Sequence, residues 1–164
     1  MAARTAAART AATRTGLIRN LATHSEQRAL PHTPEQLFDL VADVEKYPEF
    51  LPWCVGARIR SREDNIIVAD LIIGFKGITE QFTSRVKLDR AAMKIDVAYQ
   101  DGPFKYLNNH WLFQSSDSEK CDIDFFIDFE FKSRLLQALM GPLFNEAVRR
   151  MVGAFEGRAL QLYG

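Results

Sequence analysis

The spacing of hydrophobic residues predicts a central region of strands with helical regions on either side. Between residues 55 and 131, apolar side chains recur at every second position, the period of a strand with one buried face. Turn-forming runs such as Asp64-Asn65 and Asp101-Gly102-Pro103 interrupt the pattern at short intervals. This pattern is typical of an antiparallel meander. The predicted strands lie close to residues 55–60, 66–75, 78–88, 93–99, 109–113 and 123–131.

A short strand and a short helix are expected before this region. Glu26–Leu30 is the candidate strand. Thr33 can cap a helix, Pro34 suits its first position, and Gln36 completes a capping box. Apolar residues at helical spacing follow, so the helix is predicted from about residue 34 to 45.

A second helical region closes the chain. Residues 133 to about 160 carry a wide apolar stripe that Gly141-Pro142 interrupts, which indicates one long kinked helix or two consecutive helices. The segregation of strands and helices predicts an α+β fold. In this fold a curved antiparallel sheet of about seven strands packs around the long C-terminal helix, often with a space between them.

The run from Tyr47 to Cys54 holds three aromatic residues and two prolines. Prolines so closely spaced exclude a regular helix or a central strand, so the run is expected to be a stiff apolar connection. A connection with this much aromatic surface either plugs the end of the core or forms the rim of an apolar ligand cavity. The sequence pattern leaves both alternatives open.

Composition and charge indicate one ordinary globular domain. The chain has 164 residues, 47% of them hydrophobic, and a net charge of zero. Residues 1–24, rich in Arg, Ala and Thr, are expected to be a disordered leader, with a mitochondrial presequence as the alternative, and residues 25–164 to be the domain. The rest of the chain is mildly acidic without a basic stripe, which argues against DNA as a partner.

Motifs for catalysis and metal binding are missing from the sequence. It has no GxSxG, P-loop, GxGxxG or HExxH pattern, so no catalytic residue is predicted. Its two cysteines, Cys54 and Cys121, are far apart and are expected to be buried thiols of a reduced intracellular protein. The three histidines lack ligand spacing, so no metal is expected. What remains is either a container for an apolar molecule or a set of apolar surfaces that simply pack on each other.

Several segments together resemble a known family, and the run Tyr-Pro-x-Phe-x-Pro-x-Cys at residues 47–54 is the most specific of them. The others are Leu30–Val41, Asp43–Lys46, Gly74–Ile78, Glu80–Val86, Gly102–Leu107, Trp111 with Phe113, and Phe144–Met151. These segments resemble the coenzyme Q-binding START-like family, part of the polyketide cyclase/dehydrase and lipid-transport superfamily. The resemblance covers about residues 26 to 162.

The resemblance implies a helix-grip fold that binds ubiquinone or a similar isoprenoid lipid between sheet and helix. Such a protein supports respiratory electron transport without catalysis, carries ubiquinone as its ligand rather than as a cofactor, and contacts a membrane surface transiently. Bacterial relatives of similar pattern are ribosome-association toxins that bind the large ribosomal subunit, and the motif does not separate the two roles. The domain resembles alphaproteobacterial members, which favours the bacterial cytoplasm or the inner-membrane surface; a cleaved leader would favour the mitochondrial matrix side instead.

Under the lipid hypothesis, the Gly141-Pro142 kink is expected to control entry of the ligand. Lys76 and Tyr106 are candidates for contacts with a polar head group. The ribosome hypothesis needs a basic surface patch instead. The expected wall or mouth residues are Tyr47, Phe50, Trp53, Phe75, Phe82, Trp111, Leu139, Phe144 and Val148. The candidate basic residues are Arg58, Arg60, Arg62, Arg149, Arg150 and Arg158.

Overall fold

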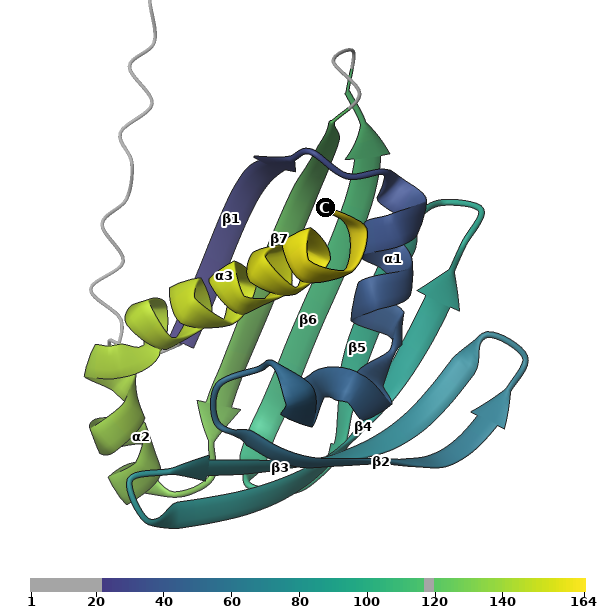
Figure 1. The fold of residues 1–164 in the computed structure, drawn as a ribbon. Coiled ribbons are helices and arrows are strands. Elements are labelled where there is room, and N and C mark those ends of the chain that lie inside the picture. Colours follow the sequence, from purple (N-terminus) through teal and green to yellow (C-terminus); the bar gives the residue numbers. More distant parts are fainter. Residues whose placement is uncertain (1–21, 117–119) are drawn as a thin grey trace, which may run out of the picture.

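A computed structural model describes residues 22–116 and 120–164. The strands are β1 (Ala22–Leu30), β2 (Cys54–Glu63), β3 (Ile66–Phe75), β4 (Ile78–Asp89), β5 (Lys94–Asp101), β6 (Phe104–Ser115) and β7 (Cys121–Phe131). The α-helices are α1 (Pro34–Ala42), α2 (Arg134–Met140) and α3 (Phe144–Tyr163), and the 3₁₀ helices are η1 (Val44–Glu49) and η2 (Gly141–Leu143). All seven strands form one antiparallel sheet in the order β1-β7-β6-β5-β4-β3-β2 (Figure 1).

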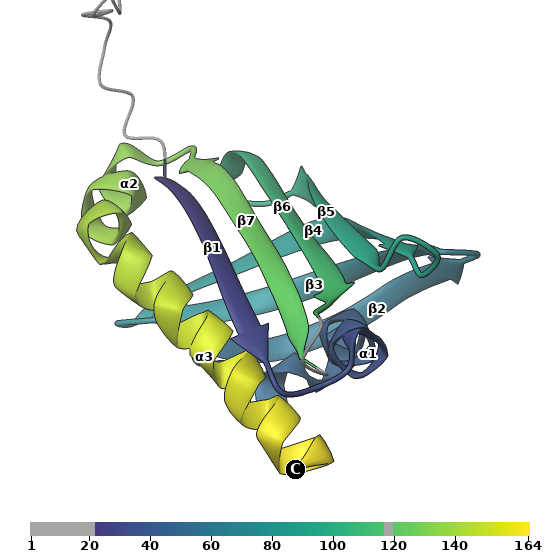
Figure 2. The same ribbon diagram turned by 90° about the horizontal axis from the view of Figure 1, so that it is seen from above.

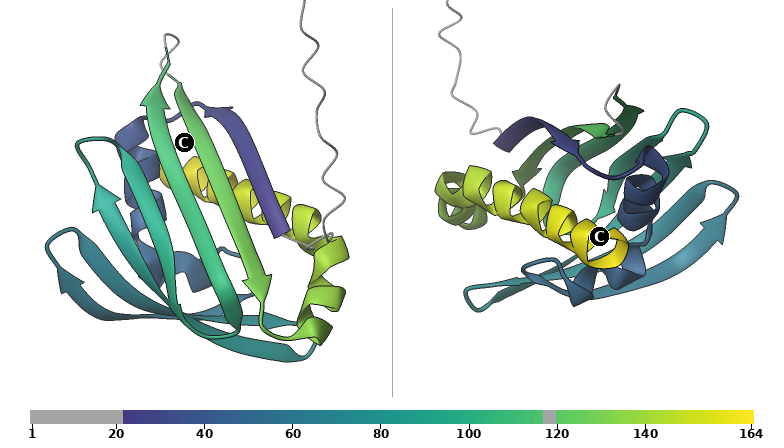
Figure 3. Two further views of the ribbon diagram at one scale, coloured as in Figure 1. Left: turned by 180° about the vertical axis from the view of Figure 1, so that it is seen from behind. Right: turned by 45° about the horizontal axis from the view of Figure 1, so that its top comes forward.

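The sheet curves around α3, which crosses its concave face (Figures 1 and 2). Seen from behind, the convex face carries no helix in the part of the chain that the structure describes (Figure 3). One layer of sheet therefore packs against one layer of helices, and the core lies between them. The predicted α+β helix-grip fold is confirmed.

The first helix begins as predicted and ends earlier. Both hydrogen bonds of the capping box form, from the Gln36 backbone N to Thr33 Oγ1 (3.2 Å) and from the Thr33 backbone N to Gln36 Oε1 (3.1 Å). The helix ends at Ala42 rather than near residue 45, and η1 follows with Pro48 inside it. A 3₁₀ turn tolerates this proline where a continued α-helix would lose a backbone hydrogen bond.

The first strand is longer than predicted. It begins at Ala22, so residues 22–24 belong to the sheet and not to the expected leader, whose other residues lie outside the described part. The inward positions of this strand are His24, Glu26 and Arg28, which are partly buried beneath α3. Since these side chains are polar, the strand lacks the apolar alternation that would have predicted its start.

The C-terminal region forms two helices rather than one kinked helix. Between α2 and α3 the residues Gly141–Leu143 form a 3₁₀ turn that includes Pro142. α3 then packs on the sheet with one apolar stripe, made of Phe144, Val148, Val152, Phe155 and Ala159. The short helix α1 packs against the same face of the sheet as α3 (Figure 2).

Candidate ligand-binding cavity

A cavity of about 250 Å³ lies between the concave face of the sheet and α3. Its floor comes from alternate residues of β3 to β7, because every second side chain of a strand points to the same face. Its roof comes from residues of α3 spaced three and four apart, such as Phe144, Val148, Met151 and Phe155. The other lining residues are Val41, Val44, Tyr47, Leu51, Pro52, Trp53, Cys54, Leu71, Ile73, Phe82, Ser84, Val86, Ile95, Val97, Leu107, Asn109, Trp111, Ile127, Phe129, Met140 and Ala147.

We define the mouth of the cavity as the side lined by the η1–β2 loop and by the last residue of α2. Leu51, Pro52 and Trp53 from this loop line the cavity and are partly exposed, as is Met140 at the end of α2. Five residues of the run Tyr47–Cys54 line the cavity, whereas Phe50 packs against Phe155 at the edge of the core, so both predicted alternatives apply to parts of the run. Trp53 adopts a φ of 66°, which a bulky residue rarely does, and its carbonyl accepts a hydrogen bond from the Gly74 N–H (2.8 Å).

The structure places some of the predicted site residues in the cavity wall and others outside it. Those in the wall are Tyr47, Trp53, Phe82, Trp111, Phe144 and Val148. Phe50 lies behind the wall, with its ring centroid 5.3 Å from that of Phe155 and beneath Arg158. Phe75 packs edge-on against Trp53 instead of lining the cavity. Leu139 is 48% exposed, because it lies on the outer side of α2.

The two candidate head-group residues also lie outside the wall. Lys76 is exposed in the β3–β4 turn, where its ammonium lies 5.4 Å from the centre of the Phe75 ring. Tyr106 pairs with Glu130 on the convex face, because the strand alternation that turns Leu107 and Asn109 inward turns Tyr106 outward. The rim therefore lacks the polar contacts that were expected of these two residues.

Two polar residues of the floor were not predicted. Ser84 lies between Phe82 and Val86 on the inward face of β4, and Asn109 precedes Trp111 on the inward face of β6. The signal was present in the sequence, since both stand at apolar-face positions of alternating strands. A polar residue at such a position is either paired within the core or faces a cavity.

Two ionisable groups of the wall are neutral near pH 7. Burial raises the pKa of the Tyr47 phenol, which donates a hydrogen bond to the Val41 carbonyl. Burial also raises the pKa of the Cys54 thiol, which donates a hydrogen bond to the Gly56 carbonyl. No Asp, Glu, Lys, Arg or His is among the described lining residues, so this cavity suits an uncharged ligand.

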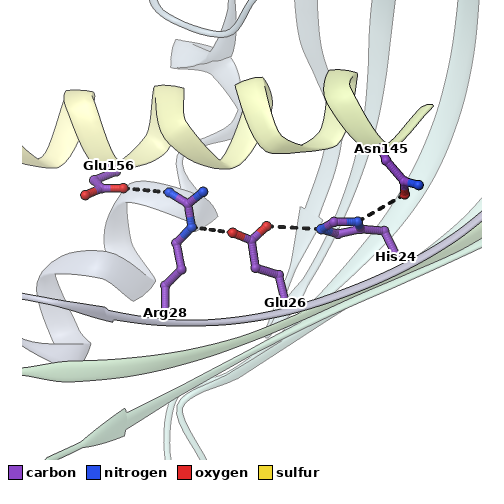
Figure 4. A network of polar contacts seen from close by, with 5 residues as sticks. All are labelled: His24, Glu26, Arg28, Asn145 and Glu156. Carbon is purple, nitrogen blue, oxygen red and sulfur yellow. Dashed lines mark hydrogen bonds and ion pairs between the residues drawn. The ribbon is translucent and has the colours of Figure 1, made fainter. Parts of the chain in front are cut away.

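A chain of polar contacts joins the edge of the sheet to α3 (Figure 4). Arg28 on β1 donates hydrogen bonds to Glu26 and, at 2.7 Å, to Glu156 on α3. His24 lies between Glu26 (3.1 Å) and Asn145 of α3 (3.4 Å). This β1–α3 network holds the roof over the sheet along one side.

Most of the arginines of the predicted basic patch are paired with carboxylates. Arg58 and Arg60 both bind Asp70, at 3.0 Å and 2.7 Å. Arg150 binds Glu146 on the same helix, and Arg158 binds Glu49. Arg62 makes a longer ion pair with Glu45, at 4.0 Å, and Arg149 is exposed on α3. The pairing reduces the positive charge available to a phosphate backbone.

The described residues contain neither a cluster of metal ligands nor a helix able to span a membrane. Within residues 22–116 and 120–164, no group of three or more His, Cys, Asp or Glu side chains is placed to hold a metal ion. In the same residues, no helix combines the length and hydrophobicity needed to span a bilayer.

Comparisons with known proteins agree on the family. The sequence profile described as "Polyketide cyclase / dehydrase and lipid transport" matches residues 30–156. The ribosome association toxin RatA of Rickettsia prowazekii is 40% identical over 138 residues, which cover 82% of this chain and 94% of that protein. The mitochondrial coenzyme Q-binding protein COQ10 homolog B of Xenopus laevis is 34% identical over 144 residues, covering 86% of this chain and 59% of that protein.

Solved structures show the same fold. An 18 kDa protein from Caulobacter crescentus is 40% identical, with a TM-score of 0.71, over 87% of this chain and 98% of that one. The Zhui aromatase/cyclase from Streptomyces has a TM-score of 0.76 at 16% identity, over 86% of this chain and 94% of that one. At that identity the likeness concerns the fold alone.

Proposed function

The chain belongs to the polyketide cyclase/dehydrase and lipid transport family, and we propose that it binds ubiquinone or a similar isoprenoid lipid without catalysing a reaction. The observation that carries this proposal is the uncharged, mainly apolar cavity between the sheet and α3. Its volume is close to the lower limit of known small-molecule sites. A long isoprenoid tail would therefore extend through the mouth beyond Trp53 and Met140.

The chemistry of the wall favours binding over catalysis. General acid–base catalysis needs a side chain that titrates near the working pH, and the described wall has no carboxylate, imidazole or amine. Its thiol, Cys54, has a raised pKa and no neighbouring base in the wall, so it is a poor nucleophile. Ligand affinity would come mostly from apolar burial, at about 0.8 kcal/mol for each buried methylene.

A membrane would supply such a lipid, and the exposed apolar residues beside the mouth favour contact with its surface. Leu135 and Leu139 are exposed on α2, whose last residue lines the cavity, and Val55 is exposed next to the loop of the mouth. Arg134 is exposed beside Leu135, and Lys76 is exposed beside Phe75, which packs on Trp53, so both cations suit anionic head groups. Transient contact of this side with the bacterial inner membrane is therefore part of the proposal.

The first test is extraction of lipid from the protein purified from a quinone-producing host, followed by mass spectrometry. We expect ubiquinone near one equivalent. Ala147→Trp, which places a bulky ring at a small lining residue, should reduce the yield strongly, whereas Ala91→Trp in the exposed β4–β5 turn should not. Circular dichroism establishes that both variants fold. A folded wild-type protein without any isoprenoid lipid would contradict the proposal.

Ribosome association is the second candidate function, because several relatives that cover most of the chain are named ribosome association toxins. Exposed Arg149 is the candidate contact on α3, because the other arginines of that helix bind carboxylates. We expect co-sedimentation with large ribosomal subunits that weakens with salt, and Arg149→Glu to weaken it further. An absence of co-sedimentation at low salt would exclude this role.

A further inference from the structure

Ser84 presents a hydroxyl to the floor of the cavity. It is 2% exposed and lines the cavity from β4. A hydroxyl at such a position needs a hydrogen-bond partner when the cavity fills with an apolar ligand and water leaves it. A strand position between Phe82 and Val86 would accept an apolar residue for packing alone, so the hydroxyl indicates a polar partner that arrives with the ligand.

Asn109 is held in one orientation beside the same floor. Its Oδ1 accepts a hydrogen bond from Trp111 Nε1 (3.1 Å), and its Nδ2 donates one to the Phe126 carbonyl (2.8 Å). The indole can only donate and the carbonyl can only accept, so the amide cannot be flipped. One N–H and one lone pair of the amide remain for a ligand.

The register of the sheet brings these two residues to either side of Val97. Val97 pairs with Asn109 on β6 and with Val86 on β4, and Ser84 lies two residues from Val86 on the same face. Both polar groups therefore face the cavity from the floor, beneath α3. The mouth offers mostly hydrocarbon instead, from Pro52, Trp53 and Met140.

We propose that Ser84 and Asn109 bind the polar head of the ligand, so that it lies head inward with its apolar tail at the mouth. The proposal rests on the proposed function of lipid binding and adds the direction of the ligand and the residues that select it. Both side chains can donate a hydrogen bond, so they select a neutral head with acceptor oxygens, such as a quinone ring. An isoprenoid hydrocarbon has no acceptor oxygen and would form no hydrogen bond with either side chain.

The two tryptophans of the chain allow a direct test, because Trp111 lies at the floor beside Asn109 and Trp53 at the mouth. A quinone ring quenches indole fluorescence when the two are in contact. Ubiquinone-2 is titrated to saturation into Trp53→Phe, which retains Trp111, and into Trp111→Phe, which retains Trp53. Quenching is compared at saturation, because Trp111→Phe also removes the donor to Asn109 Oδ1 and can weaken binding. We expect strong quenching in the first variant and weak quenching in the second.

Binding affinities of floor variants test the two polar side chains without changing either tryptophan. In the otherwise wild-type chain, Ser84→Ala and Asn109→Leu should each weaken ubiquinone-2 binding about three- to tenfold, the effect of one lost hydrogen bond. Binding of farnesene, an isoprenoid hydrocarbon without oxygen, measured by displacement of an apolar dye, should not weaken. Asn108→Leu, exposed on the convex face of the same strand, is the control.

The outcomes separate this inference from the proposed function. Binding of ubiquinone-2 with stronger quenching of Trp53 than of Trp111 would overturn the head-inward orientation and leave lipid binding intact. Equal losses for ubiquinone-2 and farnesene in both floor variants would show a packing role and overturn the selection. Binding of neither probe by the folded wild-type protein would contradict the proposed function itself.

Discussion

Gly102 occupies a place in the β5–β6 turn where a side chain does not fit. Its φ is 137°, and a Cβ there would lie 2.7 Å from Phe82 Cβ and 2.8 Å from the Gln81 carbonyl oxygen. Phe82 lines the cavity, so this close approach of the turn also helps to position the wall. Gly102 thus contributes to the shape of the cavity by its close packing against a wall residue.

We expect Gly102→Ala to lower the free energy of unfolding by about 2 kcal/mol, from backbone strain and displacement of Phe82. Urea denaturation measures this loss. Gly77→Ala is the control, since its φ of 78° is also unfavourable but no atom lies within 4 Å of the added Cβ. An equal loss in both variants would show that the close contact with Phe82 contributes nothing.

Asp70 is a buried carboxylate on the convex side, bound by three donors. Thr83 donates to its Oδ1 at 2.6 Å, and Arg58 and Arg60 donate to its Oδ2. Burial by itself raises the pKa of Asp70, but the hydrogen bonds from Thr83, Arg60 and Arg58 outweigh this and hold it at about 2. The folded-state pKa is thus below that of the unfolded chain, which is about 4.

The stabilisation by Asp70 is therefore complete above the unfolded-state pKa and is lost as the pH falls toward 2. We expect Asp70→Asn to cost about 2 kcal/mol at pH 7, because the amide cannot accept from both arginines and Thr83. The cost should shrink between pH 4 and pH 2, as measured by urea denaturation at each pH. A cost that does not depend on pH would mean that the carboxylate charge is unimportant.

At the residue scale, the sequence predicted the apolar wall better than the polar contacts. Trp111, Phe144 and Val148 belong to alternating or helical stripes, and periodicity alone turns them inward. Leu139 has helical spacing too, but α2 is a separate helix whose direction depends on η2, and this turns Leu139 outward. Lys76 and Tyr106 were predicted as head-group contacts from their polar groups alone. Whether a strand residue reaches the cavity depends instead on which face of the sheet its side chain points to.

At the scale of elements, α3 is held by contacts at both sides of its C-terminal half. Glu156 binds Arg28 of β1, and Arg158 binds Glu49 of η1 at 2.7 Å. The preceding segment, α2 with η2, has no buried residue. This contrast favours movement of α2 and η2, rather than of all of α3, when a ligand enters.

The coupling between Arg28 and Glu156 is expected to be about 0.5 kcal/mol, because both side chains are partly exposed. A double-mutant cycle with Arg28→Met and Glu156→Gln measures it from urea denaturation. Hydrogen exchange in the single variants should rise in α3 more than in α1. A coupling of zero together with unchanged exchange would remove the role of this ion pair in holding the roof.

The predicted elements were mostly right in kind and less so in their ends. β1 extends back to Ala22 because its inward residues bind α3 through polar groups, and hydrophobic spacing does not detect such a face. α1 stops at Ala42 because η1 takes over before Pro48. Whether Gly141-Pro142 kinks one helix or separates two helices depends on how the flanking segments pack on the sheet. The hydrophobic pattern of a single sequence does not predict that packing.

At the scale of the whole molecule, an internal cavity lowers stability, and a ligand that fills it should restore it. With ubiquinone-2 at about a hundred times its dissociation constant, binding contributes about 2.7 kcal/mol. For a domain of this size we expect the melting temperature to rise by about 5–10 °C. Differential scanning fluorimetry measures the shift. Ala147→Trp, which already occupies the space, should give a much smaller rise, and an equal rise would place the ligand elsewhere.

The pairing of β1 with β7 has a consequence for synthesis of the chain. Thr23 and Asp128 are hydrogen-bonded at a separation of 105 residues, and α3 follows later still. During translation the first strand therefore waits for nearly the whole domain to emerge before it has a partner. Until then the concave face, with its many phenylalanines, is uncovered and open to association with other nascent chains. Slow translation or premature termination before residue 144 would thus favour aggregation or chaperone capture over a partly active product.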